Sequence, residues 1–292
     1  MISIIIPFYN EKESLPVLIG QLNKQLTGKE YEIILVDDGS TDNFHPPAGG
    51  SNVKLIKHKK KKGKGRALLT GIRNAAGEII VFMDADLQDD PKDLPKLLKK
   101  LDGGYDLVNG IRKERQDSFL VKAYSFLASK FLKIFLRSPY TDINCGYKAF
   151  KREVLTDFAF YGNNFRFFPL AVYYNGFRVT EVEVTNRKRL YGVSKFGSSK
   201  LIIGIFDTIT AYFLYKFSEK PLHFFGIIGG TAFLIGSLIT VILVIQRVFF
   251  HMMLYRRPLL LFGVLLIIVG IQIGMTGIIG ELIVFLHKKQ KN

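Results

Sequence analysis

The sequence predicts an α/β protein with a mostly parallel sheet, followed by two membrane-spanning helices. Up to about residue 220, short apolar runs alternate with segments of helical periodicity. Such alternation of strands and helices is typical of a parallel sheet with helices on both faces. Nearer the C-terminus, residues 222–245 and 258–280 form two long apolar stretches without a charged residue. These two observations determine the predicted fold class.

The predicted elements follow in order along the chain. The expected strands are Ile2–Pro7, Glu32–Asp37, Val53–Lys57, Ile79–Asp84 and Asp106–Gly110. The expected helices are Ser14–Leu26, Gly65–Ala76 and Pro91–Leu101. Each helix has an end signal: Ser14 is the expected N-cap of the first, Gly77 follows the second, and Asp90 precedes the proline of the third.

Polar side chains follow three of these strands at the point where each strand ends. Tyr9-Asn10-Glu11 comes after the first strand, Asp37-Asp38-Gly39-Ser40 after the second and Asp84-Ala85-Asp86 after the fourth. Ligands of open parallel sheets bind beyond the carboxyl ends of the strands. The three clusters are therefore predicted to form one binding site.

The cluster after the fourth strand predicts a metal site. Asp84 and Asp86 are one residue apart, which puts both carboxylates on one face of an extended chain, and Gln88 adds an amide oxygen. Such oxygen ligands suit Mg²⁺ or Mn²⁺, ions that keep several waters and share substrate phosphates. An isolated Asp-x-Asp also marks ordinary turns, so the metal prediction depends on the neighbouring clusters.

Two common nucleotide-binding signatures are missing from the sequence. No Gly-x-Gly-x-x-Gly follows the first strand, and no Gly-x-x-x-x-Gly-Lys-Ser/Thr occurs, so a dinucleotide-dependent oxidoreductase is not expected. Gly63-Lys64-Gly65-Arg66 is interpreted as a turn into the second helix, where its amides and Lys64 can bind a phosphate. Cys145 is the single cysteine, so a disulfide within the chain is impossible, and we interpret it as a small core residue.

The two apolar stretches exceed the roughly 20 residues that cross a bilayer as a helix. We expect spans over about 222–246 and 258–282, and a pair of core helices is the alternative. Two spans form a hairpin, so the N-terminal domain and the C-terminal tail would lie on one side. The positive-inside rule favours the cytoplasm for that side. The flanking lysines are Lys216, Lys220, Lys288, Lys289 and Lys291, whereas the outer ends carry Arg247, Arg256 and Arg257.

The formal net charge of +16 indicates an anionic partner. The anionic face of a membrane suits a chain with two spans better than nucleic acid does. The basic run Lys57–Lys62 belongs to this surface or is simply a solvated loop. Phe119–Leu136 and Leu201–Phe217 have apolar residues between lysines, so we expect helices in the membrane interface, with core packing as the alternative.

Four motifs, taken together and in order, resemble one enzyme family. They are Pro7-Phe8-Tyr9-Asn10-Glu11, Asp37-Asp38-Gly39-Ser40, Asp84-Ala85-Asp86-Leu87-Gln88 and Asp142-Ile143-Asn144-Cys145-Gly146-Tyr147-Lys148. The set is similar to the inverting family 2 glycosyltransferases, which have a Rossmann-like A-type fold. Within that family it most resembles the synthases of dolichol-phosphate and undecaprenyl-phosphate hexoses. The chain has no tryptophan, so it lacks the Gln-x-x-Arg-Trp motif of the processive polysaccharide synthases.

The resemblance implies a role for individual residues. The residues expected to bind the nucleotide sugar are Pro7, Tyr9, Glu11, Asp37, Lys64, Asp84 and Gln88. The expected ligands of Mg²⁺ or Mn²⁺ are Asp84, Asp86 and Gln88. Catalysis is expected to involve Asp86, Asp142 and Arg112, with Asp142 near the reacting carbon.

An acceptor that is a polyprenyl phosphate needs cationic groups at the bilayer surface. Gly110-Ile111-Arg112 matches a Gly-Ser-Arg stretch of the family, and residues 189–195 match its Arg-x-x-Gly-x-Ser-Lys loop. Arg112, Arg189 and Lys195 are therefore predicted to bind the acceptor phosphate. Lys122 and Ser125 are further candidates, although relatives place an arginine near Val121 instead. The alternative is that these residues only solvate a surface.

The sequence thus predicts metal-dependent, inverting transfer of a hexose from a nucleotide sugar to a polyprenyl phosphate at the cytoplasmic face of the cell membrane. Transfer to a lipid hydroxyl or a protein, and a non-catalytic membrane scaffold, are the alternatives. The expected parts are a catalytic domain (1–200), an amphipathic juxtamembrane helix (201–220) and the hairpin with its tail (221–292). UDP-glucose, UDP-N-acetylhexosamine and GDP-mannose all fit as donors. A homo-oligomer is expected from small residues suited to helix contacts, namely Gly226, Gly229, Gly230 and Gly236.

Overall fold

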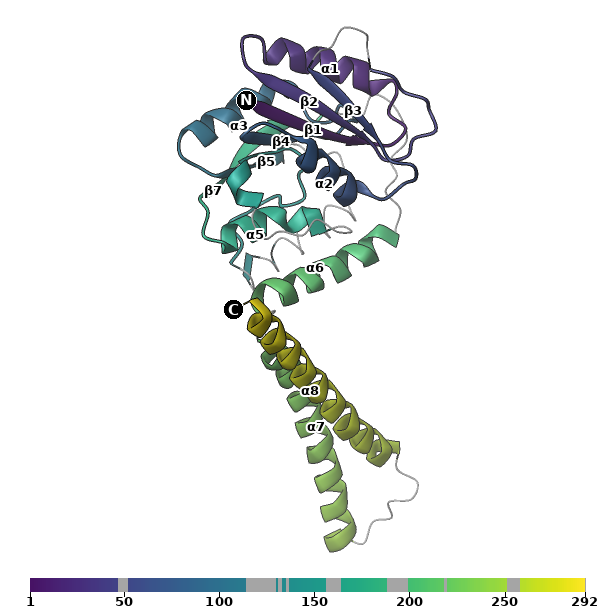
Figure 1. Cartoon of the computed structure of the whole chain (residues 1–292). Coiled ribbons are helices and arrows are strands. Elements are labelled where there is room, and N and C mark those ends of the chain that lie inside the picture. Colours follow the sequence, from purple (N-terminus) through teal and green to yellow (C-terminus); the bar gives the residue numbers. More distant parts are fainter. Residues whose placement is uncertain are drawn as a thin grey trace. The chain divides into compact units, whose positions relative to one another are not determined.

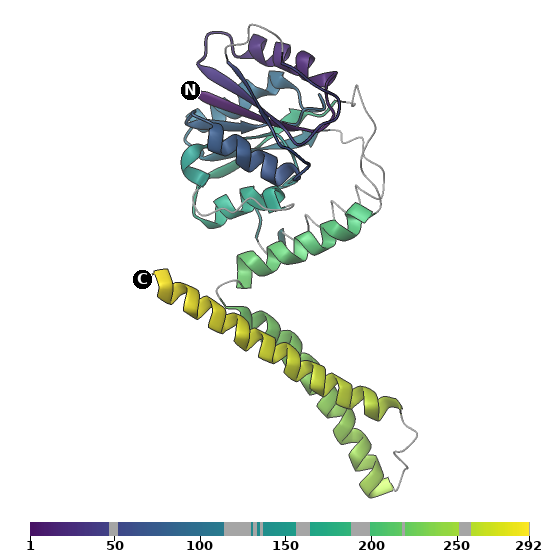
Figure 2. The ribbon, with the colours of Figure 1, turned by 45° about the vertical axis from the view of Figure 1, so that its right-hand side comes forward.

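The computed structural model describes residues 1–46, 52–113, 130, 133–134, 137–155, 164–187, 199–217, 220–250 and 258–291. The chain divides into two compact units, Met1–Ala211 and Tyr212–Asn292. The first unit contains the sheet, and the second contains two long helices that run side by side (Figures 1 and 2).

Within the described residues, seven strands form one sheet in the first unit, in the order β3-β2-β1-β4-β6-β5-β7. The strands are β1 (Ile2–Phe8), β2 (Tyr31–Asp37), β3 (Val53–Lys57), β4 (Ile79–Phe82), β5 (Leu107–Lys113), β6 (Lys148–Lys151) and β7 (Val179–Thr185). β3, β2, β1 and β4 are parallel, and β5 is parallel to β7. Only β6 is antiparallel to its neighbours β4 and β5 among these strands of the described chain. The predicted mostly parallel sheet is confirmed.

Helices cover both faces of this sheet (Figure 1). One face packs against α1 (Ser14–Gln25) and α3 (Leu94–Asp102), which follows the short turn η1 (Pro91–Asp93). The other face packs against α2 (Lys64–Asn74) and α5 (Phe168–Tyr174). Two further 3₁₀ turns, η2 (Arg152–Leu155) and η3 (Asn164–Phe167), follow β6 and precede α5.

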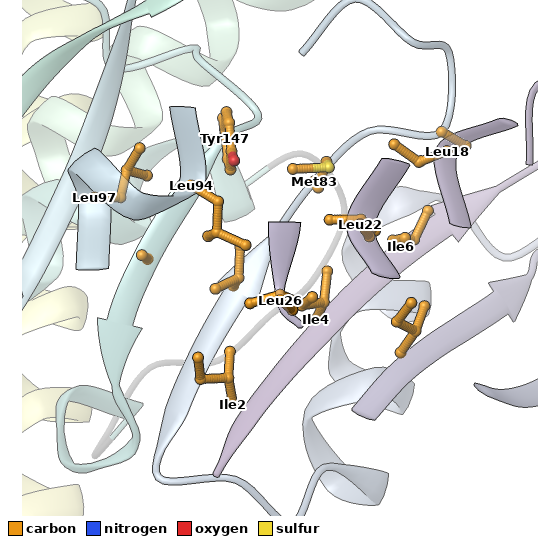
Figure 3. Packing of buried hydrophobic residues seen from close by; sticks show 14 of the residues in the cluster. Ile2, Ile4, Ile6, Leu18, Leu22, Leu26, Met83, Leu94, Leu97 and Tyr147 are labelled. Atoms are coloured by element: carbon orange, nitrogen blue, oxygen red, sulfur yellow. The ribbon is translucent and has the colours of Figure 1, made fainter. Parts of the chain in front are cut away.

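The apolar sequence of β1 explains why both faces are covered. Successive side chains of a strand point to opposite sides. Ile4 and Ile6 are fully buried in the cluster under α1 and α3 that Figure 3 shows. Ile5 points the other way, and a methyl group on Gly71 of α2 would lie 2.2 Å from its Cγ2 atom. Each face therefore needs its own helical layer to exclude water.

The structure corrects several predicted boundaries. β4 ends at Phe82, so Asp84 and Asp86 lie in the loop beyond it, and the alternation of strand side chains does not set their directions. Ser14 is the first residue of α1, and its hydroxyl donates to Glu11, so its predicted role as N-cap is wrong. Asp90 does cap its helical turn, because its side chain accepts from the backbone N–H of Lys92 at 3.0 Å.

β6 and β7 were not predicted from the sequence. β6 has only four residues, two of them lysines, and it begins at Lys148, the last residue of the fourth motif. β7 reads Val-Thr-Glu-Val-Glu-Val-Thr, the alternating pattern of a half-exposed strand, which a search for continuous apolar runs passes over. In the sheet, β6 lies between β4 and β5, and β7 lies at the edge beside β5.

The second unit contains α7 (Pro221–Phe250) and α8 (Pro258–Lys291), and α6 (Ser199–Phe217) precedes them. Among the described residues, α7 and α8 are the helices long and apolar enough to cross a membrane. Only 17% and 11% of their most apolar segments are buried, which argues against the alternative of two core helices. In α6, Thr208 is buried whereas Phe206 and Ile209 are exposed, so this helix has an uncovered apolar side.

Glycines bring α7 and α8 into close contact. A methyl group on Gly229 would lie 2.6 Å from the carbonyl oxygen of Gly270, and one on Gly236 would lie 2.5 Å from that of Gly263. Such small residues let two helix backbones approach each other in a membrane. Two of the four glycines considered for oligomer contacts are thus used within the chain, while a methyl group on Gly230 would meet nothing within 4 Å.

Replacing Gly270 by leucine should loosen this hairpin. The new side chain would enter space filled by the backbone of Gly229 and Phe233, and overpacking of this kind costs about 1–3 kcal/mol. We expect a lower thermal unfolding midpoint for the detergent-solubilised protein. Gly274→Leu is the matched control, since a methyl group there meets nothing within 4 Å. Equal midpoints for the two variants would contradict the close packing.

Candidate active site

The ends of β1 and β2 are joined by hydrogen bonds between their polar clusters. The backbone N–H of Ser40 donates to Asp37 Oδ1 at 2.7 Å, and Ser40 Oγ accepts from the N–H of Asn10 at 2.9 Å. Asn10 Oδ1 in turn accepts from the N–H of Thr41 at 2.8 Å. The two clusters that the sequence assigned to a nucleotide therefore form one continuous edge, next to the buried Pro7 of β1.

A buried carboxylate attaches the basic run to this edge. Asp38 accepts backbone N–H groups from Lys62 and Gly63 at 2.8 Å each, and its Oδ1 lies 2.9 Å from His58 Nδ1. Lys61 Nζ lies 3.7 Å from the centre of the Tyr9 ring. The backbone at the end of the basic run is thus held beside the predicted nucleotide residues, while the side chains of Lys59–Lys62 are exposed.

Asp84 is held by a cation from another element. It forms an ion pair with Lys64, the first residue of α2. Burial acts to raise the pKa of Asp84, but the charge and hydrogen bond of Lys64, helped by Lys148 and Arg112, lower it below its usual value. A methyl group on Gly146 would lie 2.7 Å from Asp84 Oδ2, so the 142–148 motif packs directly against this carboxylate.

The loop after Asp84 gathers further acidic side chains. Asp86 Oδ1 accepts from the N–H of Gln88 at 3.3 Å, and Leu87 between them has a positive φ of 60°. Burial, followed by the charges of Asp84 and Asp86, raises the pKa of Asp89 to about 7. The three carboxylates therefore lie within electrostatic reach of one another.

The side chains of this loop fit a divalent cation shared with a substrate. Asp84, Asp86 and Gln88 offer only oxygen ligands, and Asp84 is kept ionised. In the part of the chain that the structure describes, no three acidic, histidine or cysteine residues form a closed cage for a metal. An open set of this kind suits Mg²⁺ or Mn²⁺, which keep waters and bind substrate phosphates.

Asp142 and Arg112, both expected to take part in catalysis, are partners in an ion pair. Arg112 Nε donates to Asp142 Oδ2 at 2.7 Å and its Nη2 donates to Asp142 Oδ1 at 2.9 Å, a bidentate pair in which Asp142 is 8% exposed. Burial acts to lower the pKa of Arg112, but the hydrogen bond and charge of Asp142 raise it. Arg112 is therefore charged at neutral pH.

The Asp142 loop is positioned by residues that the sequence did not single out. Glu181 of β7 accepts the backbone N–H groups of Thr141 and Asp142 at 2.6 and 3.2 Å. Asn109 of β5 donates to the carbonyl oxygen of Asp142 at 2.9 Å and to Glu181 at 3.1 Å. Side chains of β5 and β7 thus hold the backbone of the Asp142 loop, so the position of this loop depends on the order of these strands in the sheet.

Lys148 is a buried cation behind the same loop. Its ammonium group donates to the carbonyl oxygens of Ile143 and Cys145. Burial lowers the pKa of Lys148 to about 8. Cys145 is buried in the core cluster, as predicted, and burial raises the pKa of its thiol to about 12. Lys148 belongs to the quoted motif, which was the available signal for it.

The structure brings together one part of the predicted site. Tyr9, Glu11 and Asp37 lie along the ends of β1 and β2, and Asp84, Asp86 and Gln88 lie in the loop after β4. The acceptor candidates Lys122, Ser125, Arg189 and Lys195 lie outside the described residues. Of that group, only Arg112 has described geometry, and it faces Asp142.

Comparisons with known proteins agree with this architecture. Residues 3–159 match "Glycosyl transferase family 2". The chain is 31% identical to the undecaprenyl-phosphate 4-deoxy-4-formamido-L-arabinose transferase of Enterobacter sp. (strain 638), over 97% of this chain and 88% of that protein. The chain therefore belongs to glycosyltransferase family 2, and it is a glycosyltransferase. The predicted resemblance to bacterial polyprenyl-phosphate glycosyltransferases is confirmed.

Solved structures show the same fold. Glucosyl-3-phosphoglycerate synthase from Mycobacterium tuberculosis, in complex with Mn²⁺, UDP-glucose and phosphoglyceric acid, gives a TM-score of 0.57 at 20% identity, covering 74% of this chain and 79% of that one. Its complex with Mn²⁺ and UDP-glucose gives 0.58 at 20% identity, with 73% and 78% covered. The predicted A-type glycosyltransferase fold is confirmed.

Gly146→Ala should impair the reaction by displacing Asp84. The added methyl group would lie 2.7 Å from a carboxylate that itself contacts Lys64, so one of them must move. Because a displacement of about 1 Å in an active site can cost on the order of 100-fold, we expect a loss of about that size in kcat/KM. Gly20→Ala, at an open position of α1, is the control. Wild-type kcat/KM in Gly146→Ala would refute the contact.

The buried Lys148 predicts a pH dependence of stability. With a pKa near 8 in the folded chain and 10.5 as its usual value, the unfolded chain binds more protons between these limits. The free energy of unfolding should therefore rise with pH in this window. Denaturant unfolding should show wild type gaining stability relative to Lys148→Met from about pH 8 to 10.5. The exposed Lys29→Met is the control, and a pH-independent difference for Lys148→Met would contradict the assignment.

Proposed function

We propose that this chain transfers a sugar from a nucleotide sugar to a polyprenyl phosphate, in a metal-dependent reaction that inverts the anomeric carbon. The observation that carries the proposal is the length of the match to the undecaprenyl-phosphate transferase. It covers 97% of this chain, and so includes the sheet, the candidate site and both apolar helices. An enzyme with a lipid acceptor needs all three.

The donor would bind along the ends of β1, β2 and β4. Tyr9 and Asp37 are proposed for the base and ribose, and Lys64 for the diphosphate. When bound by Asp84, Asp86 and Gln88, Mg²⁺ or Mn²⁺ would neutralise the charge that builds on the leaving diphosphate. The related fold that binds Mn²⁺ with UDP-glucose supports this arrangement.

Transfer to a phosphate acceptor requires little proton transfer by the protein. A phosphate oxygen of the lipid attacks the anomeric carbon while the bond from that carbon to the diphosphate breaks on the opposite side, which inverts the centre. The attacking phosphate is already ionised at neutral pH, so no strong general base is needed. Arg112 would bind the phosphate from its fixed position on Asp142. Arg189, Lys195, Lys122 and Ser125 stay proposed contributors.

The membrane arrangement follows from the helices. We propose that α7 and α8 cross the membrane as a hairpin, with the catalytic unit and the C-terminus in the cytoplasm. Lys216 and Lys220 precede α7, and Lys288 and Lys289 lie at the end of α8, so these lysines flank the same end of the hairpin. The exposed Phe206 and Ile209 of α6 suit the membrane interface.

The function is tested by identifying the lipid product. Membranes containing the full chain should convert a radiolabelled nucleotide sugar and undecaprenyl phosphate or dolichyl phosphate into a polyprenyl-phosphate sugar. The panel should contain UDP-glucose, UDP-N-acetylglucosamine, GDP-mannose and a nucleotide-linked 4-amino-arabinose derivative. The sequence predicts a hexose, whereas the arabinose derivative in the relative's name supports the last donor.

Asp86→Asn should reduce this transfer by about 100-fold or more. Metal stabilisation of developing charge is worth several kcal/mol, and about 1.4 kcal/mol is tenfold in rate. Asp102→Asn changes an exposed carboxylate at the end of α3 and is the matched control. Product labelled on a lipid hydroxyl or a protein, or full activity in excess EDTA, would refute the proposal.

A further inference from the structure

The loop that carries the candidate metal ligands has no regular secondary structure of its own. It runs from Met83, after β4, to Asp90, before η1, and within it Leu87 has the positive φ of 60° that a non-glycine residue rarely adopts. An oxygen-ligand site needs fixed ligand positions. The surrounding structure must therefore hold this loop in place.

Backbone contacts with the end of β7 hold one side of the loop. The N–H of Arg187 donates to the carbonyl oxygen of Gln88 at 2.8 Å, and Asp89 forms an isolated antiparallel bridge with Asn186. The N–H of Thr185 donates to Asp93 Oδ2 at 2.7 Å. The chain leaving β7 thus pairs with the metal-binding loop for several residues.

An ion pair between the half-buried Arg187 and a buried carboxylate reinforces this contact. The guanidinium of Arg187 pairs with Asp90, a carboxylate that is 7% exposed. Asp90 also accepts the N–H of Lys92 at 3.0 Å, which fixes the start of η1. A buried carboxylate that loses its cation is strongly unfavourable, so Asp90 depends on Arg187 for its position.

The electrostatic setting makes this cation important. Asp89 and Asp93, like Asp90, are less than 9% exposed. Asp84 and Asp86 lie earlier in the same loop. Arg187, just beyond β7, approaches this acidic segment from a part of the chain that is 97 positions away from Asp90. Its guanidinium and its backbone N–H both act on the segment that begins at Gln88.

We infer that Arg187 is a positioning residue for the metal-binding loop: through Asp90 and the carbonyl group of Gln88 it fixes the side chains that bind the cation and the diphosphate. The inference rests on the proposed function for the identity of the ligand. Arg187 acts without touching the reacting atoms, because its guanidinium is paired with Asp90. Residues that orient metal ligands typically change metal affinity by about 10- to 100-fold when they are replaced.

The test compares nucleotide binding with and without the metal. Calorimetry on the detergent-solubilised full chain would measure the affinities for UDP and for GDP, each in excess Mn²⁺ and in EDTA. In Arg187→Gln the affinity in Mn²⁺ should fall by about 10- to 100-fold, and the affinity in EDTA should stay at the wild-type value. Lys92→Gln, which removes an exposed cation from the same turn, should match wild type in both conditions.

Two further variants separate positioning from folding. Asp90→Asn should reproduce the loss of affinity in Mn²⁺. The double variant should lose no more affinity than the single variant that binds more weakly, because the pair acts as one unit. Arg187→Lys keeps the charge and should recover part of the affinity in Mn²⁺. Equal losses in Mn²⁺ and EDTA, additive losses in the double variant, or unchanged affinities throughout would overturn the inference.

Failure of the proposed function gives a different pattern. If wild type makes no polyprenyl-phosphate sugar but binds UDP or GDP with Mn²⁺, the comparison of the variants still decides the role of Arg187. If wild type binds neither nucleotide, a titration with Mn²⁺ alone replaces the nucleotide-binding measurement. A wild-type Mn²⁺ affinity in Arg187→Gln would then overturn the inference, and a loss of about 10-fold or more would support it.

Discussion

The buried carboxylates at one edge of the sheet constrain the rest of this structure. A carboxylate removed from water needs a cation or several N–H donors, because the charge is otherwise poorly solvated. Asp38 is satisfied by two backbone amides and His58, and Asp142 by Arg112, while the half-buried Asp84 pairs with Lys64. Each partner comes from a different element, so satisfying these charges also fixes how the elements meet.

These ion pairs hold several charged side chains in fixed positions at the candidate site. Lys64 pairs with Asp84, and Arg112 pairs with Asp142, so each cation already lies at the position proposed for ligand binding. Groups held in this way need little reorganisation when a diphosphate or a lipid phosphate arrives. Lys148 contributes differently, since it is fully enclosed and supports the carbonyl groups of the Asp142 loop from behind. The site thus combines half-buried cations, Lys64 and Arg112, with the buried Lys148.

The two halves of the sheet divide the work. The parallel strands β3, β2, β1 and β4 form one half of the sheet and present the clusters proposed for the donor. β6 lies between β4 and β5, and this position brings the 142–148 motif against Asp84. β7, at the far edge, supplies Glu181 to the Asp142 loop and precedes Arg187, which pairs with the loop of the candidate metal ligands. The half of the sheet with β6, β5 and β7 therefore helps to position Asp84 and the loop that follows β4.

The local features of this protein were determined by the sequence alone. The apolar runs specify β1 to β5 to within a few residues, and the two charge-free stretches specify α7 and α8, because the length and apolar pattern of each segment are set by residues adjacent in the chain. The polar clusters after the strands could be found for the same reason. Short or alternating strands such as β6 and β7 lack a strong local signal and were missed.

Which charges meet was decided only by the tertiary structure. Arg112 and Asp142 are 30 residues apart, and Arg187 and Asp90 are 97 apart. Their pairing depends on the order of β6, β5 and β7 in the sheet, which no residue spacing encodes. The sequence therefore determined which residue types lie at the ends of the strands. The sheet decided their partners, because burial leaves each carboxylate only the cation that the neighbouring strand or helix brings within reach.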